Sequence, residues 1–272
     1  MTVHPSAIIS THAELGADVE VGPFAQIEAG VRVGDGCRIR SHAFLCRGTV
    51  LGKGCDIHHN AIVGHLPQDF SYKGEPVATL LDEGVTVREN ATVHGSVGET
   101  GTLIGGHSYL MVGSHVAHNC KLGRNVVLAN GALLAGHVQV GDGAFISGNV
   151  VIHQFVRVGS LAILSGASRI GMDVPPYVVA DGINTIASLN AVGLRRALHL
   201  SDDDRRQIKS AYKILYRSEL ALKEALERLR NEFTSPAVAH WVEFFTYPSR
   251  RGFCRFRPST RRGTSVDAGP PV

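Results

Sequence analysis

Aliphatic residues recur at every sixth position along two long stretches of the chain. From Ile9 to Val63, and again from Ile104 to Ile170, each sixth residue is Ile, Leu or Val without interruption. An amphipathic helix repeats about every 3.6 residues and a half-buried strand every two, so neither explains this period. A hexapeptide β-helix does, because each repeat forms one face of a triangular prism and three repeats complete a coil of about 18 residues. The pattern therefore predicts an all-β solenoid with its aliphatic residues pointing inward.

A second register lies two residues before each aliphatic position and holds small or β-branched residues. Cysteines occupy it at positions Cys37, Cys55 and Cys120. Because this position falls near a corner of the prism, where space is short, we expect these thiols to be core residues and not nucleophiles. The five cysteines include no CxxC pair, so free thiols in a reducing, cytoplasmic setting fit better than disulfides or a zinc ribbon.

Two interruptions divide the predicted prism, which we expect to span residues 1–186. The period breaks at about 64–80, a segment that contains two prolines, and again at about 94–103, which is rich in glycine. Insertions in solenoids usually mark the face on which ligands bind. The sequence therefore predicts that any site lies beside these two segments.

The period stops after Ile170, and residues 187–257 are predicted to form a helical C-terminal domain. Its first helix is expected around 187–199. A helical cap of this kind covers the open end of a solenoid, which would otherwise expose unpaired strand edges. The basic tail at 258–272 is rich in Gly and Pro and is predicted to be disordered.

Three serines mark the expected beginnings of the later helices. Ser201 precedes three aspartates, which is typical of a helix N-cap with acids in the first turn. Ser218 is expected to cap a second helix, and Ser235 followed by Pro236 to begin a third.

Charge and hydropathy exclude two classes of partner. The 272-residue chain has a formal net charge of +3, which is too mild to indicate nucleic-acid binding. No run of 18 apolar residues is present, and the N-terminus lacks the basic and apolar regions of a signal peptide. The sequence predicts a cytoplasmic protein without a transmembrane segment.

Stacking of the 18-residue coils gathers histidines on one edge of the prism. Residues one coil apart lie on neighbouring rungs separated by about 4.8 Å. Counting in coils places the following residues together, none of them at an inward position: His115, His118, Gly136, His137, His153 and Gln154. The other histidines, His94 among them, are expected to be ordinary surface residues.

Three uses of this edge are open from the residues alone. A neutral histidine can act as a general base toward a sugar hydroxyl. Three histidines can hold a zinc ion that activates water, provided that their nitrogens converge at about 2.1 Å. The third possibility is a surface ladder without chemistry, in a scaffold or binding protein.

Several motifs on this edge and beyond it are specific enough to indicate a family. The chain resembles the UDP-N-acetylglucosamine O-acyltransferases that start lipid A biosynthesis. The resemblance covers most of the chain up to about residue 257 and rests on the motifs HVAHNC, LAGHVQVGD, VIHQFVRVG, PQDFSYKGEP, DVPPYV and NAVGLRR. It implies a left-handed parallel β-helix with a C-terminal helical cap, assembled as a homotrimer with active sites between subunits.

The resemblance also implies a reaction and a set of site residues. The reaction moves an (R)-3-hydroxyacyl chain from acyl carrier protein to the 3-hydroxyl of UDP-N-acetylglucosamine, with no metal or other cofactor. In the resemblance, His118 stands at the position of the family's catalytic base. Gly136 stands at the position whose backbone N–H contacts the thioester oxygen. Gly166 matches the position that sets acyl length, and a glycine there leaves room for a longer chain. The implied acceptor contacts are Asp69, His115 and His137 on the sugar side, and His153, Gln154, Asn190 and Arg196 on the nucleotide side.

Four departures from the family pattern bear on the acceptor. Asn119 replaces an aspartate beside the base, so we expect a backbone carbonyl to orient His118 instead. Ser71 stands where a lysine is frequent, and Val192 and Ala197 replace a glutamate and an arginine. These departures keep open N-acylation of a 3-amino or 2-amino sugar nucleotide. A trimeric zinc hydrase of the same fold is a further alternative.

Overall fold

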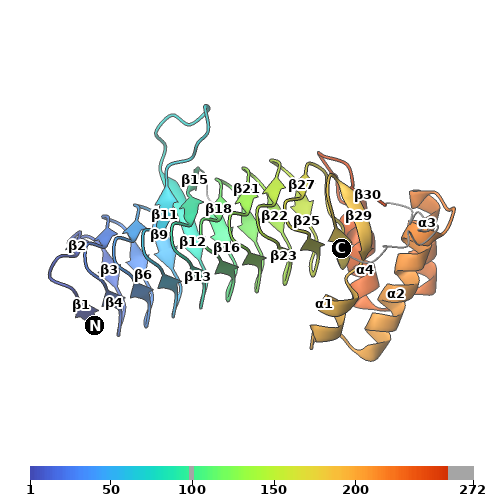
Figure 1. Cartoon of the computed structure of the whole chain (residues 1–272), viewed down its shortest axis with the longest axis horizontal. Helices are drawn as coiled ribbons and strands as arrows, with labels where there is room; N and C mark the ends of the chain where they lie inside the picture. Colours follow the sequence, from blue (N-terminus) through green and yellow to red (C-terminus); the bar gives the residue numbers. More distant parts are fainter. Residues whose placement is uncertain (98–100, 257–272) are drawn as a thin grey trace, which may run out of the picture.

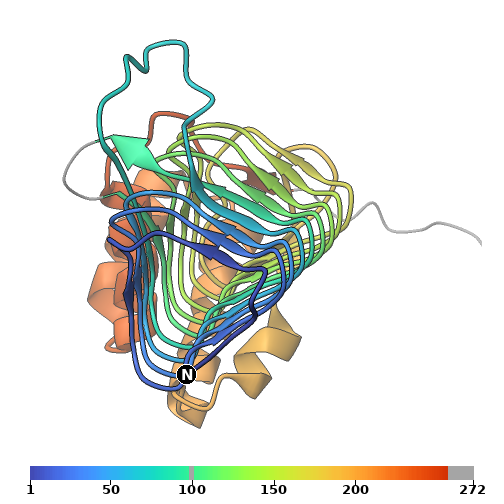
Figure 2. The same cartoon turned by 90° about the vertical axis from the view of Figure 1, so that its left-hand side faces the viewer.

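The chain winds into a left-handed parallel β-helix of triangular cross-section, and a group of helices closes one end (Figures 1 and 2). The computed structural model describes residues 1–97 and 101–256. The predicted disorder of 258–272 therefore lies outside the described residues. We call the three sheets the first, second and third face, in the order in which the chain visits them.

The first face is a 12-stranded sheet that runs the length of the prism and into the cap. Its strands, in spatial order, are β1 (Thr2–Val3), β4 (Glu20–Val21), β7 (Arg38–Ile39), β10 (Asp56–Ile57), β13 (Thr86–Val87), β17 (Tyr109–Leu110), β20 (Val127–Leu128), β23 (Phe145–Ile146), β26 (Ile163–Leu164), β28 (Val178–Ala180), β29 (Thr185–Leu189) and β30 (Arg255–Phe256).

The second and third faces are 9-stranded sheets. The second comprises β2 (Ile8–Ile9), β5 (Gln26–Ile27), β8 (Phe44–Leu45), β11 (Ile62–His65), β14 (Thr92–His94), β18 (His115–Val116), β21 (Leu133–Leu134), β24 (Val151–Ile152) and β27 (Arg169–Ile170). The third comprises β3 (Glu14–Leu15), β6 (Arg32–Val33), β9 (Thr49–Leu51), β12 (Val77–Leu81), β15 (Ser96–Val97), β16 (Thr102–Ile104), β19 (Lys121–Leu122), β22 (Gln139–Val140) and β25 (Arg157–Val158).

The core confirms the six-residue period. The aliphatic residues of the six-residue period are buried from Val21 to Val63 and from Ile104 to Ile170, whereas Ile9 and Leu15 at the N-terminal end are partly buried. Leu110, Leu128 and Ile146 are fully buried on successive coils. Each such side chain contributes about 1.5–3 kcal/mol on burial. The prediction that the small residues two positions before each aliphatic residue lie in the core is confirmed for the cysteines, because Cys37, Cys55 and Cys120 are all 0% exposed.

Sharp corners join the faces, and two of the resulting edges matter here. The histidine edge joins the second face to the third and comprises residues 117–120, 135–138 and 153–156. The first edge joins the first face to the second and comprises residues 129–132, 147–150 and 165–168. Several corner residues are left-handed without being glycine, among them Asn119, with φ of 60°.

The first insertion projects from the prism beside the histidine edge (Figure 1). It is narrower than the predicted 64–80, because β11 extends to His65 and β12 begins at Val77 and pairs with both β9 and β16. The loop itself is therefore 66–76. In the second insertion, β15 pairs antiparallel with β12.

The cap contains α1 (Ala191–Arg196), α2 (Asp202–Arg217), α3 (Leu222–Glu232) and α4 (Pro236–Thr246). The helix predicted at 187–199 is shorter, because the preceding residues form β29 and pair antiparallel with β28. The predicted caps at Ser201 and Ser235 are confirmed. The prediction for Ser218 is wrong, since this residue ends α2 and Ala221 precedes α3.

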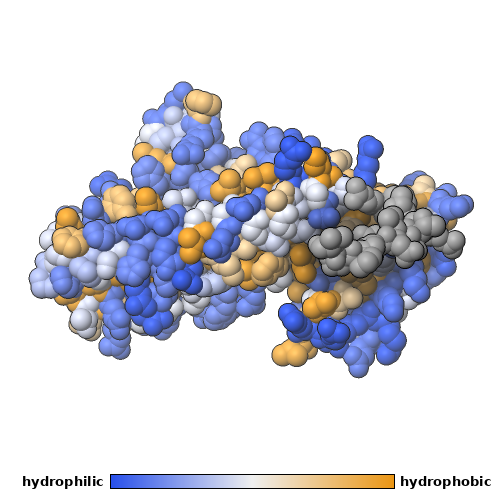
Figure 3. Space-filling model, viewed as in Figure 1, coloured by the Kyte–Doolittle hydropathy of each residue, from blue (hydrophilic) through white to orange (hydrophobic). Residues whose placement is uncertain are grey.

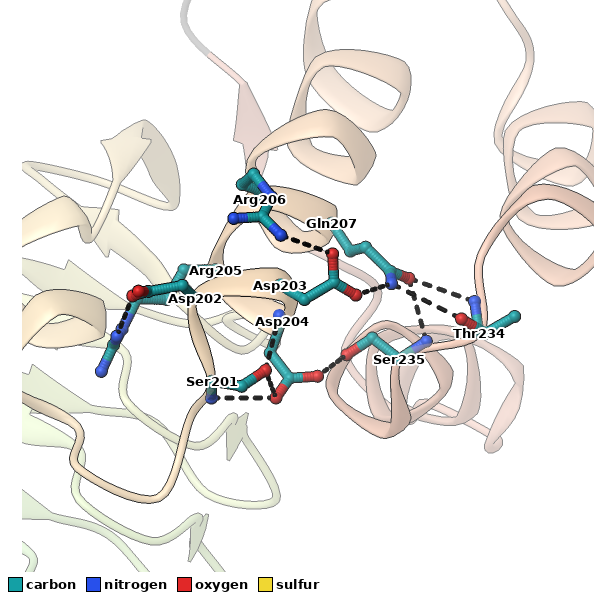
Figure 4. A network of polar contacts seen from close by, with 9 residues as sticks. All are labelled: Ser201, Asp202, Asp203, Asp204, Arg205, Arg206, Gln207, Thr234 and Ser235. Atoms are coloured by element: carbon teal, nitrogen blue, oxygen red, sulfur yellow. Dashed lines mark hydrogen bonds and ion pairs between the residues drawn. The ribbon is translucent and has the colours of Figure 1, made fainter.

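One carboxylate connects two helix caps (Figure 4). Asp204 accepts hydrogen bonds from the backbone N–H and the hydroxyl of Ser201, and it accepts another from the hydroxyl of Ser235. These bonds, those from Ser201 first, lower the pKa of Asp204. The beginnings of α2 and α4 are thereby held together above the fully buried Trp241.

The visible surface is mainly hydrophilic, with hydrophobic side chains in separate patches (Figure 3). Among the described residues, no helix combines the length and the apolar character that crossing a bilayer requires.

Candidate active site

The histidine edge gathers the predicted residues on successive coils, as their spacing indicated. The rings of His118 and His137 meet edge to face with centroids 5.3 Å apart, and His137 stacks on Phe155 at 4.6 Å. His153 and Gln154 occupy the coil of Phe155 at the same corner. A hollow of about 460 Å³ lies beside His153. The edge is thus a continuous row of aromatic and polar side chains.

His118 is held by the side chain that follows it. The Asn119 Oδ1 atom lies 2.8 Å from His118 Nδ1, and the Asn119 amide nitrogen faces the carbonyl of Val97 at 3.5 Å. This second contact assigns the oxygen of the amide to the histidine side. An amide oxygen only accepts, so Nδ1 carries the proton and Nε2 has the free lone pair of a base. The expectation that a backbone carbonyl orients His118 is wrong.

Asp69 approaches the other side of the His118 ring from the 66–76 loop. Its Oδ2 atom lies 3.9 Å from His118 Nε2. Its Oδ1 atom accepts hydrogen bonds from the backbone N–H of Ser71 at 2.9 Å and the Ser71 hydroxyl at 2.8 Å. These two bonds are the main causes that lower the pKa of Asp69, and the nearby His118 and His137 lower it further. Ser71 therefore holds the carboxylate that faces His118.

His115 is partly buried and packs beside His94, which was expected at the surface and is buried instead. His115 Nδ1 lies 2.8 Å from the Thr92 hydroxyl, and burial lowers the pKa of His115. His94 packs against the His115 ring at 4.7 Å and is only 6% exposed. Burial lowers the pKa of His94 to about 4. The sequence could have indicated this burial, because Val93 keeps the six-residue spacing and therefore places His94 at the corner between the second and third faces.

Gly136 provides space beside the His118 ring. A Cβ atom at this position would lie 2.7 Å from both Cε1 and Nε2 of His118, which is closer than real Cβ contacts. Its carbonyl accepts the N–H of Phe155, while no acceptor within residues 1–97 and 101–256 takes its own N–H. Within the described residues the N–H of Gly136 is therefore unpaired, in a buried residue next to His118.

Replacing Gly136 with alanine is expected to lower the kcat of the acyl transfer that the resemblance implies by about 10²-fold, because the added methyl group displaces His118 from its position. Steady-state kinetics measures the loss. Gly171→Ala is the matched control, since a Cβ there would meet its nearest neighbour, Asn184, at an ordinary 3.7 Å. Equal kcat values for the two variants would contradict this account.

Replacing Asn119 with alanine is expected to lower kcat by about 10- to 100-fold with little change in KM. The loss follows because His118 Nδ1 loses the acceptor that fixes its tautomer. Asn125→Ala is the control, because Asn125 is also a left-handed corner residue, with φ of 55° against 60° at Asn119. If both variants lose activity equally, backbone strain and not the tautomer is responsible.

Three predicted site residues lie elsewhere in the chain. Gly166 is on the first edge, and Arg196 ends α1. Asn190 is 4% exposed and caps α1, and both of its polar atoms are engaged: Oδ1 accepts from Gly193 N–H and Nδ2 donates to the Leu161 carbonyl. One copy of the chain therefore does not bring these residues together with His118.

The site does not provide a metal centre within one chain. Across residues 1–97 and 101–256, no three His, Cys, Asp or Glu side chains are arranged to hold a metal ion.

The solenoid and its six-residue repeat define a hexapeptide-repeat transferase. Residues 12–47 and 101–136 match the family described as bacterial transferase hexapeptide (six repeats). Residues 173–254 match domain 2 of Udp N-acetylglucosamine O-acyltransferase. The chain belongs to the family of acyl-[acyl-carrier-protein]–UDP-N-acetylglucosamine O-acyltransferases, as the following relatives show.

Curated and solved relatives cover nearly the full length. The acyltransferase of this name from Thermodesulfovibrio yellowstonii is 42% identical, over 93% of this chain and 99% of the relative. The UDP-N-acetylglucosamine acyltransferase structure from Campylobacter jejuni has a TM-score of 0.88 at 36% identity, covering 94% of this chain and all of that one. A structure from Acinetobacter baumannii has the same TM-score at 33% identity, with the same coverage.

Proposed function

We propose that this protein transfers an (R)-3-hydroxyacyl chain from acyl carrier protein to the 3-hydroxyl of UDP-N-acetylglucosamine, the first step of lipid A biosynthesis. The named activity of its relatives supports the reaction class. The observation that carries the mechanism is the free Nε2 atom of His118, whose Nδ1 is paired with Asn119 at 2.8 Å. This is the tautomer that a general base needs.

The reaction requires one base and one oxyanion donor. His118 Nε2 takes the proton of the sugar hydroxyl as its oxygen attacks the thioester carbon, and the Gly136 N–H donates to the oxyanion that forms. The tetrahedral intermediate then collapses with cleavage of the carbon–sulfur bond, and the imidazolium returns the proton to the departing thiolate. A general base contributes about 10²–10⁴-fold, and an oxyanion donor about 10²–10³-fold. Asp69, 3.9 Å from Nε2, stabilises the imidazolium.

Direct transfer is favoured over a covalent acyl-enzyme. The cysteine nearest to the base in sequence is Cys120, which is 0% exposed. Burial raises the pKa of Cys120 to about 12, so the reactive thiolate is absent at neutral pH. Cys120 therefore does not compete with the sugar hydroxyl as a nucleophile.

We propose a homotrimer as the working assembly, with each site completed by a neighbouring copy. Gly166 lies on the first edge and the base lies on the histidine edge, so two copies are needed to place both in one groove. Outward-facing apolar side chains flank the first edge: Leu133 and Val151 on the second face and Phe145 on the first are 38–43% exposed. Such a surface suits burial between subunits.

The free, buried cysteines also support a reducing cytoplasmic location.

Product analysis tests the proposal. The purified protein is incubated with UDP-N-acetylglucosamine or, in parallel, with an amino sugar nucleotide. Each acceptor is combined with a panel of 3-hydroxyacyl carrier proteins, and product masses are read. We expect a 3-O-acyl product that mild base hydrolyses. A base-stable amide, formed only with an amino sugar nucleotide, would show N-acylation instead, and the absence of product from every donor would refute acyl transfer.

A further inference from the structure

An arginine of the C-terminal segment lies over the end of the histidine row. Arg250 follows α4, and its guanidinium carbon is 4.8 Å from the centroid of the Phe155 ring. Phe155 stacks in turn on His137, with the ring planes 19° apart, and His137 contacts the ring of His118. A continuous series of side-chain contacts therefore connects Arg250 to His118.

The segment that carries Arg250 is fixed to the end of the prism. Arg251 Nε donates to the carbonyl of Gly171 at 3.0 Å, one coil beyond Phe155 on the same side. The N–H of Asp173 donates to Gly252, and the N–H of Cys254 donates back to Asp173. The residues that follow Arg250 thus hold this segment against the end of the prism.

The charge of Arg250 is available to a ligand. The side chain is exposed, and within residues 1–97 and 101–256 no hydrogen bond or ion pair engages it. A guanidinium that stacks on a ring keeps its N–H groups in its own plane, where they can bind phosphate oxygens in pairs. The hollow beside His153 also reaches Gly171, the partner of Arg251.

The positive charge of Arg250 affects the pKa of His137. The pKa of His137 is lowered mainly by burial, next by His118, and to a smaller extent by Arg250.

Both substrates of the proposed reaction carry phosphate. In the sugar nucleotide the diphosphate is attached directly to the sugar whose hydroxyl meets His118. In the acyl carrier protein the phosphodiester is separated from the thioester by the whole pantetheine arm.

We propose that Arg250 is a further substrate-binding residue, which contacts the diphosphate of the sugar nucleotide. The inference rests on the proposed function for the identity of the ligand. Arg250 acts in binding and not in the chemical step, because it is two rings away from the base. The same geometry makes it a cation that neutralises the diphosphate once the sugar is seated.

The test compares Arg250→Gln with Arg228→Gln, which removes one charge from an exposed arginine of α3. For Arg250→Gln we expect about a 10- to 100-fold rise in KM for UDP-N-acetylglucosamine, with kcat and the KM for the acyl carrier protein unchanged. Calorimetric binding of UDP, which needs no catalysis, should weaken by a similar factor. Arg250→Lys should retain part of the affinity, and Arg228→Gln should match the wild type.

Other results would overturn the inference. Unchanged KM and unchanged UDP affinity in an active Arg250→Gln protein would make Arg250 a surface residue. A rise confined to the KM for the acyl carrier protein would assign it to the phosphodiester instead. If the wild type binds UDP in an Arg250-dependent way but transfers no acyl chain, the proposed function fails and the binding role of Arg250 stands. A thermal melt of each variant confirms folding.

Discussion

Replacing His118 with alanine is expected to lower kcat/KM for acyl transfer by about 10²–10⁴-fold without lowering the melting temperature. The loss corresponds to a missing general base, since the remaining donors still bind the substrates. Stability should hold because the ring is an outward-facing corner side chain and not part of the core. Steady-state kinetics and a thermal melt on the same preparation measure the two quantities.

His12→Ala is the matched control, because His12 is an exposed histidine several coils away. It should retain wild-type activity. Activity in His118→Ala close to that of the wild type would end the assignment of the base. A lowered melting temperature, with activity that falls in proportion to the folded fraction, would indicate a structural role instead.

Replacing Arg157 with alanine is expected to reduce the free energy of unfolding by about 3–5 kcal/mol, because it leaves a buried carboxylate without its partner. Arg157 pairs with Asp173, whose side chain is 0% exposed, at 2.7 Å. The same guanidinium donates to the carbonyl oxygens of Phe244 and Tyr247 and lies 4.6 Å from the Phe244 ring. One side chain thus joins the third face to α4 and its C-terminal end.

Urea unfolding followed by circular dichroism measures this change. Arg32→Ala is the control, since Arg32 occupies the same position of a third-face strand and is exposed, so the change there should stay within about 0.5 kcal/mol. Equal effects of the two substitutions would show that the contacts of Arg157 with the cap contribute nothing. Loss of the cap before the prism would appear as a separate early transition.

The architecture of the prism was predictable because it depends on a local repeat. Once the six-residue period is recognised, the inward positions follow, and the 18-residue coil places His118, His137 and His153 on one edge by counting alone. The same count would have placed His94 at a corner, where the structure buries it. Helix caps were predictable where a serine precedes acids or proline. The prediction failed at Ser218, because α2 extends to Arg217 and Ser218 lies at its C-terminal end.

The sequence by itself determined the solenoid, its core and the row of histidines, since each depends on spacing along the chain. Only the tertiary structure decided what surrounds that row. The approach of Asp69, the amide contact that fixes the tautomer of His118, the anchoring of the cap by Arg157 and the stacking of Arg250 involve side-chain directions or segments far apart in sequence. No periodicity encodes such contacts, because loop paths and the docking of the helices set them.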